Sequence, residues 1–174
     1  MERPGWISIV GILGIVLGCF GLMGAGQMAM LPNMVKMQKQ MIADMQVQMK
    51  PEQRVQMEPF EHLMDGFWGE LPPWYMSWAV TSGLILMAIK GFYIFAALSL
   101  LQLKRSAVRQ FYWAAGLSIA AALVNAAVMV KAFSGLGVAM AMGSMMGVVL
   151  NLVLLAVVIG GDKAVFGIAR PPPL

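Results

Sequence analysis

The chain has 174 residues, of which 60% are hydrophobic and 11% are charged, and its mean hydropathy is +0.77. Water-soluble domains carry about a quarter charged residues, so this composition excludes an ordinary soluble globular protein. The formal net charge of +4 is explained mostly by basic residues that flank apolar segments, and we therefore expect no nucleic-acid partner.

Four apolar stretches are long enough to cross a hydrocarbon core, which needs about 20 helical residues. They are continuously apolar rather than alternating, which favours helices over a barrel because a spanning helix satisfies its own backbone hydrogen bonds. We predict an all-α membrane protein with four transmembrane helices and an amphipathic helical hairpin between helices 1 and 2. The stretches run from Trp6 to Met30, Met76 to Leu103, Ala107 to Val130 and Leu136 to Gly160.

This pattern divides the chain into five parts. They are a cytoplasmic N-terminus with transmembrane helix 1 (1–32), an extracytoplasmic helical hairpin (33–73), transmembrane helix 2 (74–105), transmembrane helices 3 and 4 (106–161) and a cytoplasmic Pro-rich tail (162–174). The tail ends in ARPPPL, where three prolines prevent helix continuation and favour an extended chain.

The first span also has an alternative interpretation as a signal sequence. The run IVLGC, which ends at Cys19, resembles a lipoprotein cleavage box, and GAG at 24–26 resembles a peptidase site. We prefer a transmembrane helix because the apolar run is longer than the apolar core of a signal sequence. In addition, the negative charge of Glu2 offsets the positive charge of Arg3, whereas a signal sequence begins with a positively charged region. With one cysteine the chain forms no internal disulfide, and we expect Cys19 to be a small buried hydrophobic residue.

Glycines recur in the first and fourth spans at spacings that place them on one helix face. Small residues let helix backbones approach and gain contacts that lipid tails do not replace. We expect these faces to meet other helices, either in the same bundle or in another subunit. The glycines are Gly11, Gly14, Gly18, Gly21 and Gly24 in the first span, and Gly143 and Gly147 in the fourth.

The segment between the first two spans carries a stripe of methionines. At 100° per residue the methionines fall on one helix face and three lysines (36, 39 and 50) lie roughly opposite, which predicts an amphipathic helix. Pro51 suits the first turn of a second helix, which Pro59 would kink or restart, so a helical hairpin results. Aromatic residues at 67, 68, 74, 75 and 78 are typical of an interfacial belt. The stripe contains Met30, Met34, Met37, Met41, Met45 and Met49.

Two functions are open for the methionine stripe. Thioethers favour Cu(I), and further ligands could come from Met28 with Met30, or from methionines 142, 145 and 146. Unbranched methionine also fills irregular grooves, either against the neighbouring hairpin helix or on a partner protein. We favour packing or partner contact through Met34, Met37, Met41 and Met45, because a stripe on one helix does not converge on a metal. We therefore assign no metal and no cofactor.

The sequence EPFEHLMD forms a second polar group in the hairpin. Its acidic residues and the chain's one histidine share a helix face, which could hold a divalent cation or move a proton. A solvated acidic face is the alternative, and it is the commoner one since a zinc site would need further strong ligands. The face consists of Glu58, Glu61, His62 and Asp65.

Lys90 lies inside the second span, in the run LILMAIKGFYIF (84–95). Its Cα is about 18 Å along the helix from Trp78 and about 21 Å from Lys104, near the bilayer midplane. Insertion of the charge costs about 2.5 to 3.5 kcal/mol, which the surrounding apolar residues offset, although contact with lipid remains unfavourable. Its helix face favours the bundle interior or a subunit contact, since it contains Gly83, Met87, Tyr93, Ile94 and Ala97.

None of the four spans contains Asp or Glu, so the spans supply no counter-ion for Lys90. Tyr93, Asn125, Asn151 or a freed carbonyl could solvate the ammonium, or burial could leave the amine uncharged. A carboxylate from another protein would make Lys90 an assembly determinant. A lysine tolerated through a local water defect is the fourth possibility.

The orientation follows from the basic residues beside the spans. The short turn LKRSAVR is the strongest signal, and it places both termini in the cytoplasm. The basic residues on that side are Arg3, Lys104, Arg105, Arg109, Lys163 and Arg170. The opening RPGWISIVGILGIVLGCFGL resembles small bacterial four-span proteins, and this resemblance implies the bacterial cytoplasmic membrane.

These features predict a non-catalytic accessory or structural subunit of a membrane assembly, which acts through its spans and its methionine-rich hairpin. Its expected partners are the lipid bilayer and other membrane subunits or further copies of itself. A small channel or transporter-like protein for cations or Cu(I) is the alternative. We expect no enzyme, because the spans lack a histidine–carboxylate cluster, a phosphate-binding loop and a nucleophile elbow.

Overall fold

The computed structural model of the chain describes residues 4–48 and 71–166. Its helices are α1 (Gly5–Ala29), α2 (Leu31–Gln48), α4 (Pro73–Leu101), α5 (Ala107–Ala132) and α6 (Ser134–Gly160), followed by the 3₁₀ helix η1 (Ala164–Phe166). The described residues contain no strand. α1, α4, α5 and residues Ala141–Gly160 of α6 are each long and apolar enough to cross a membrane. The all-α, four-span fold predicted from the sequence is confirmed, and the four apolar helices indicate an integral membrane protein.

The helix boundaries lie close to the predicted ones. α4 begins at Pro73 rather than at Met76, because proline is well suited to the first helical turn, where its missing N–H has no helical partner to lose. α6 begins at Ser134, two residues before the predicted Leu136. In the predicted hairpin, α2 forms the first arm, and the second arm lies outside the described residues.

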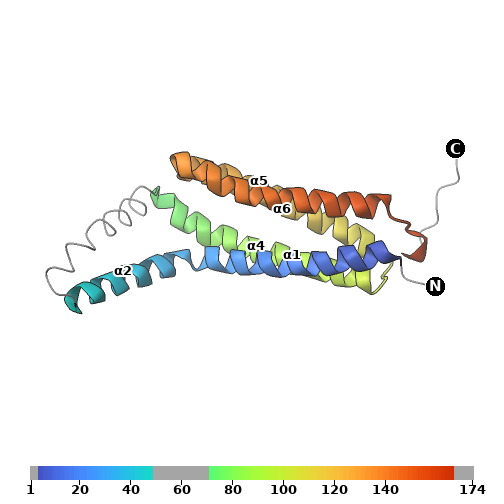
Figure 1. Cartoon of the computed structure of the whole chain (residues 1–174), viewed down its shortest axis with the longest axis horizontal. Coiled ribbons are helices and arrows are strands. Elements are labelled where there is room, and N and C mark those ends of the chain that lie inside the picture. Colours follow the sequence, from blue (N-terminus) through green and yellow to red (C-terminus); the bar gives the residue numbers. More distant parts are fainter. Residues whose placement is uncertain (1–3, 49–70, 167–174) are drawn as a thin grey trace.

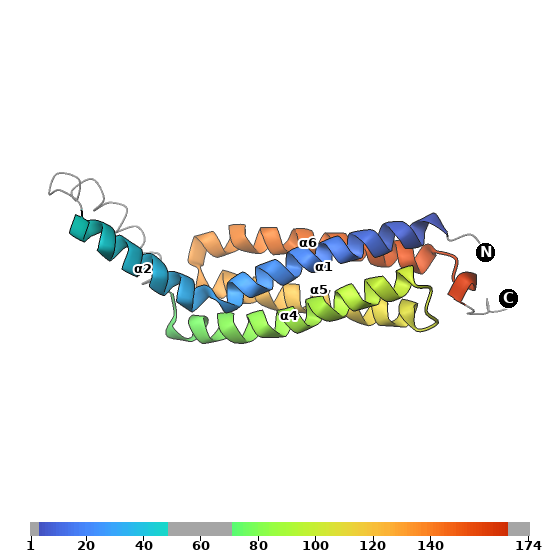
Figure 2. The ribbon, with the colours of Figure 1, turned by 90° about the horizontal axis from the view of Figure 1, so that it is seen from below.

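The four long helices form two antiparallel pairs, α1 with α4 and α5 with α6 (Figure 1). α4 also packs along α5, whereas α1 and α6 touch over a smaller area. Short connections at 102–106 and at Phe133 reverse the chain between successive helices. The start of α1 and the end of α6 therefore lie at one end of the bundle, and α2 extends beyond the opposite end (Figure 2).

A seam of glycines brings α1 against α4. Small side chains on α1 remove the steric barrier between the two backbones, so each glycine lies directly under an α4 side chain. The pairs run in antiparallel register: Gly11 with Leu101, Gly14 with Ala97, Gly18 with Ile94 and Gly21 with Lys90. Four of the five glycines predicted for this face therefore pack within the same bundle; at the fifth, Gly24, a Cβ would meet nothing within 4 Å. Gly143 and Gly147 of α6 differ, since a Cβ built on either one would meet nothing within 4 Å.

Pro32 separates α1 from α2. It has no N–H to continue the helical ladder, and its ring would clash with the carbonyl four residues earlier, at Met28. The chain consequently makes a turn at Met30, whose N–H bonds the Gly26 carbonyl at 3.0 Å, before α2 starts. This break directs α2 away from the bundle.

The turn between α4 and α5 depends on Leu103, which adopts a left-handed φ of 54°. The following N–H, that of Lys104, reaches back to the Ser99 carbonyl at 3.2 Å and closes the end of α4. Left-handed backbone is unfavourable for leucine, but here its side chain packs against the core beside it. The turn thus reverses the chain tightly and exposes the basic side chains of Lys104 and Arg105.

Two apolar clusters close the two ends of the bundle. The larger one lies at the end with the termini and joins all four long helices and η1; its large, fully buried side chains include Ile7, Tyr93, Leu100, Phe111, Val158 and Phe166. The smaller one lies at the opposite end, where the Tyr75 and Phe133 rings meet edge to face with centroids 5.1 Å apart. The middle of the bundle lies between these clusters.

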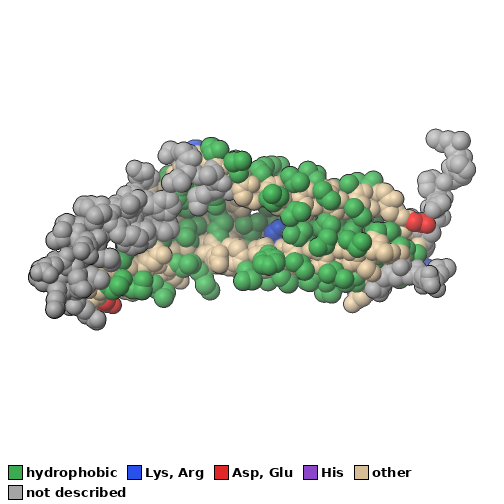
Figure 3. All heavy atoms as spheres, viewed as in Figure 1, with side chains coloured by type: hydrophobic (Ala, Val, Ile, Leu, Met, Phe, Trp, Pro, Cys, Tyr) green, Lys and Arg blue, Asp and Glu red, His purple; other side chains and the backbone are tan. Residues whose placement is uncertain are grey.

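Large apolar side chains cover the outside of all four helices. Ile12, Leu84, Trp113 and Leu152 are each 50% or more exposed, and Figure 3 shows hydrophobic side chains over much of the visible surface. A soluble protein rarely exposes an apolar surface of this extent, so lipid is the expected surroundings. The expectation that Cys19 is buried is wrong: the glycine face of α1 points toward the interior, and Cys19, which lies off that face, is exposed on the outside.

Candidate functional site

Lys90 occupies the middle of the bundle, between the two apolar clusters. Its aliphatic stem lies over Gly21, where a Cβ would come within 2.6 Å of the lysine Cε. Its ammonium crosses to α5 and donates a hydrogen bond to the Ser118 hydroxyl oxygen at 2.6 Å. The side chain therefore bridges three helices, α1, α4 and α5.

The register of α4 and α5 brings Lys90 to Ser118. The Tyr75–Phe133 contact fixes the ends of the two helices that lie opposite the larger apolar cluster. The number of residues from Tyr75 to Lys90 on α4 equals the number from Ser118 to Phe133 on α5. Because the two helices are antiparallel, Lys90 and Ser118 therefore lie at the same depth in the bundle. That depth is about 22 Å from the ring contact.

Tyr93 lies one turn further along α4 and is 1% exposed. Its ring packs against Phe111 with centroids 5.5 Å apart, and the Lys90 ammonium is 5.8 Å from the ring centroid, within the range of a cation–π contact. The phenol hydroxyl is buried and has no hydrogen-bond partner among the described residues. Tyr93 thus contributes its π face to the ammonium and leaves its hydroxyl unused.

The two asparagines lie on other helices, and neither side-chain oxygen accepts a hydrogen bond from Lys90. Asn151 of α6 is buried; its amide nitrogen donates to the Gly147 carbonyl at 2.7 Å, whereas its Oδ1 has no partner in the described part of the chain. Asn125 of α5 is half-buried, and its Oδ1 is likewise buried without a partner there. Both amides therefore retain an acceptor that nothing described satisfies.

Ser118 is the contact of Lys90 that sequence reasoning missed. It is 1% exposed although it is polar. A signal was present: Ser118 precedes Asn125 by seven residues, so the two share one face of an otherwise apolar helix. Of the face predicted for Lys90, Gly83, Tyr93 and Ala97 are buried, whereas Met87 is 37% exposed.

A hollow lies between the two helix pairs part of the way along the bundle, and basic side-chain atoms show in it (Figure 3). Lys90 itself is half-buried rather than buried, so its side chain is accessible from the bundle surface. An ammonium has three N–H donors. The Ser118 hydroxyl takes one, and among the described residues no carboxylate contacts Lys90.

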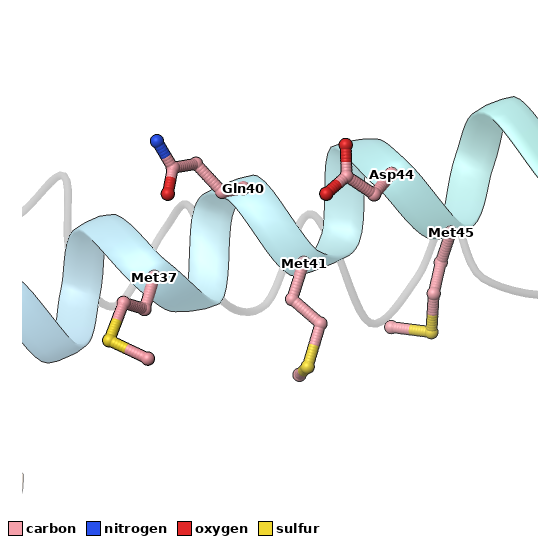
Figure 4. A pocket seen from close by; sticks show the side chains of 5 residues that line it. All are labelled: Met37, Gln40, Met41, Asp44 and Met45. Carbon is pink, nitrogen blue, oxygen red and sulfur yellow. The ribbon is translucent and has the colours of Figure 1, made fainter.

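The methionine stripe lies on α2, beyond the end of the bundle. Met37, Met41 and Met45 project to one side of the helix, and Gln40 and Asp44 project from another side (Figure 4). These five residues line a shallow recess of about 300 Å³. Met30, Met34, Met37 and Met41 are between 45% and 68% exposed, so most of the stripe is uncovered.

The further methionines considered as copper ligands do not gather around the stripe. Met28 is half-buried against α4, where its sulfur accepts a long contact from the Ser82 hydroxyl at 3.7 Å. Met142 and Met146 lie on the outside of α6, 70% and 63% exposed, on a different helix from the stripe. In residues 4–48 and 71–166, no group of three or more His, Cys, Asp or Glu side chains is placed to hold a metal ion.

Part of the predicted hairpin lies outside the described residues. This applies to the face formed by Glu58, Glu61, His62 and Asp65, and to the aromatics at 67 and 68. Of the other predicted belt residues, Trp74 is 42% exposed and Trp78 is half-buried. Tyr75 is 2% exposed, because its ring packs on Phe133 instead of facing the interface.

Comparison with protein-family models, with curated proteins and with solved structures finds no match for this chain.

Proposed function

We propose that this protein is a non-catalytic accessory or structural subunit of a membrane assembly. The observation that carries the proposal is the uncovered methionine stripe on α2, a helix that extends away from its own bundle. Methionine side chains are flexible and polarisable, so they adapt to the surface of a partner. An exposed apolar stripe of this kind marks a protein contact more often than a metal site, since thioethers along one helix face do not converge.

The interior of the bundle supports the same proposal. Lys90 has donors that the described spans leave unused, and the Oδ1 atoms of Asn125 and Asn151 lack partners there. Buried polar groups are normally satisfied, so these atoms indicate that further polar atoms contact the bundle in the membrane.

We place the protein in the bacterial cytoplasmic membrane with both termini in the cytoplasm. The basic residues of the LKRSAVR turn and the resemblance of the first span support this placement. In this orientation α2 and its methionine stripe face the outside, where they would meet extracytoplasmic parts of partner subunits.

A small channel or transporter-like protein is the second candidate. The polar atoms of Lys90, Ser118, Asn125 and Asn151 inside an otherwise apolar bundle favour it, because a solute pathway needs such groups. The positive charge of Lys90 would repel cations in that pathway, which weakens the candidate for cation cargo.

Purification in a mild detergent separates the two functions. The full chain is extracted from its own membrane, and the mass of the protein in the particle is compared with the 18.8 kDa of one chain. A defined particle that contains several subunits and no metal supports the subunit proposal. A monomer that retains copper through purification would overturn it and support the transporter.

A further inference from the structure

The Lys90 side chain ends in an amino group near the middle of its span, and the hydrogen-bond donors of this group are only partly used. Ser118 accepts one N–H at 2.6 Å, and the Tyr93 ring offers a weaker contact at 5.8 Å. A charge-assisted bond to a carboxylate is roughly twice as strong as a bond to a neutral group. The groups around Lys90 therefore position the ammonium without neutralising it.

The chain itself does not supply that carboxylate within the membrane. The sequence has no Asp or Glu between Gly5 and Ala29, nor from Pro73 to Leu101, Ala107 to Ala132 or Ser134 to Gly160. A second copy would bring the same spans and a second Lys90, so homo-oligomerisation repeats the charge instead of balancing it. Like charges in a medium of low dielectric constant repel strongly.

Lipid headgroups are also poorly placed. Their phosphates lie at the edge of the hydrocarbon core, about 15 Å from its midplane, whereas a lysine stem reaches about 6 Å. The stem of Lys90 is moreover held over Gly21 and directed across to Ser118 rather than along the helix axis toward either surface. This direction favours an acceptor that reaches the same depth inside the membrane.

We propose that Lys90 is the docking point for a transmembrane helix of a different protein that carries an Asp or Glu near the middle of its span. The carboxylate binds the free N–H groups of Lys90, and Ser118 and Tyr93 hold the ammonium in place. The partner helix approaches through the hollow between the helix pairs (Figure 3). This inference rests on the proposed subunit function and specifies the chemistry of the partner.

The test uses the full chain, tagged and produced in its own membrane, with partners identified after detergent extraction. Lys90→Met removes the charge and keeps an apolar stem. Lys131→Met is the matched control, because Lys131 is an exposed residue in the last turn of α5. We expect Lys90→Met to reduce the amount of partner per bait at least tenfold, while Lys131→Met and Lys90→Arg retain it. Thermal unfolding of each purified bait establishes that it is folded.

A second experiment gives a result even if Lys90→Met does not fold. The partner's intramembrane carboxylate is changed to the corresponding amide with the wild-type bait unchanged, and we expect the same loss. Exchange of the charges, with Lys90→Asp opposite a lysine in the partner, should restore the complex.

The inference is overturned if folded Lys90→Met retains its partner, or if none of the co-purifying chains has a carboxylate within a span. In either case the subunit proposal stands, since an assembly has still been found. If the wild-type chain purifies alone, the subunit proposal and this inference both fail.

Discussion

Gly83 of α4 lies directly on the backbone of α1 at Ala29. A Cβ built on Gly83 would be 2.6 Å from the Ala29 nitrogen and 2.9 Å from the Ala25 carbonyl oxygen. Both neighbours are backbone atoms within or at the end of a helix, and neither can move aside as a side chain could. The absence of a side chain at Gly83 therefore permits the close approach of α4 to the C-terminal end of α1.

Gly83→Ala should destabilise the bundle by about 1 to 3 kcal/mol, because the added methyl group forces the two helices apart. Gly91→Ala on the same helix is the matched control: a Cβ there meets nothing within 4 Å, and alanine is the better helix former by about 1 kcal/mol. Thermal unfolding in detergent measures both. Equal midpoints for the two variants would contradict the close packing at Gly83.

Phe111→Ala should destabilise the protein by about 3 to 5 kcal/mol, because it leaves a cavity in the larger apolar cluster where Phe111 packs on Tyr93. Trp113→Ala should have little effect although it removes a larger side chain, since Trp113 is 66% exposed and lipid replaces its contacts. Titration with a denaturing detergent compares the two variants. A larger loss for Trp113→Ala would mean that this side chain is covered by another protein.

The methionine stripe can be tested for its chemistry by replacing Met37 and Met41 together. If the stripe contacts a partner, leucine should preserve most of the complex and glutamine should weaken it about tenfold or more, because an adaptable apolar surface is required. If the stripe binds Cu(I), leucine should abolish binding, since it has no thioether. Co-purification measures the first property, and titration with Ag(I) as a Cu(I) substitute measures the second.

The orientation can be tested by thiol labelling in a Cys19→Ala background, which removes the chain's one cysteine. Met41→Cys on α2 should react with a membrane-impermeant maleimide added to intact cells, because its side chain is exposed and is expected outside. Arg105→Cys, in the exposed turn after α4, should react after the membrane is opened. The opposite pattern would reverse the orientation, and labelling of both sites in intact cells would disprove the four-span arrangement.

The sequence by itself determined the number, type and approximate limits of the spans. Apolar runs such as the one from Trp6 to Met30 must form helices in lipid, because a spanning backbone has no water to satisfy its hydrogen bonds. The same reasoning located Lys90 near the middle of its span and identified the glycine seam of the first span as a packing face.

The tertiary structure decided which side of each helix faces inward. In a soluble protein the apolar stripe of a helix marks its inner face, but lipid is as apolar as the bundle interior, so that signal is lost in a span. For this reason the sequence did not reveal that Cys19 points outward, that Tyr75 packs on Phe133, or that Ser118 receives the Lys90 ammonium. These relationships depend on the register between helices far apart in the chain, which only close packing of their side chains sets.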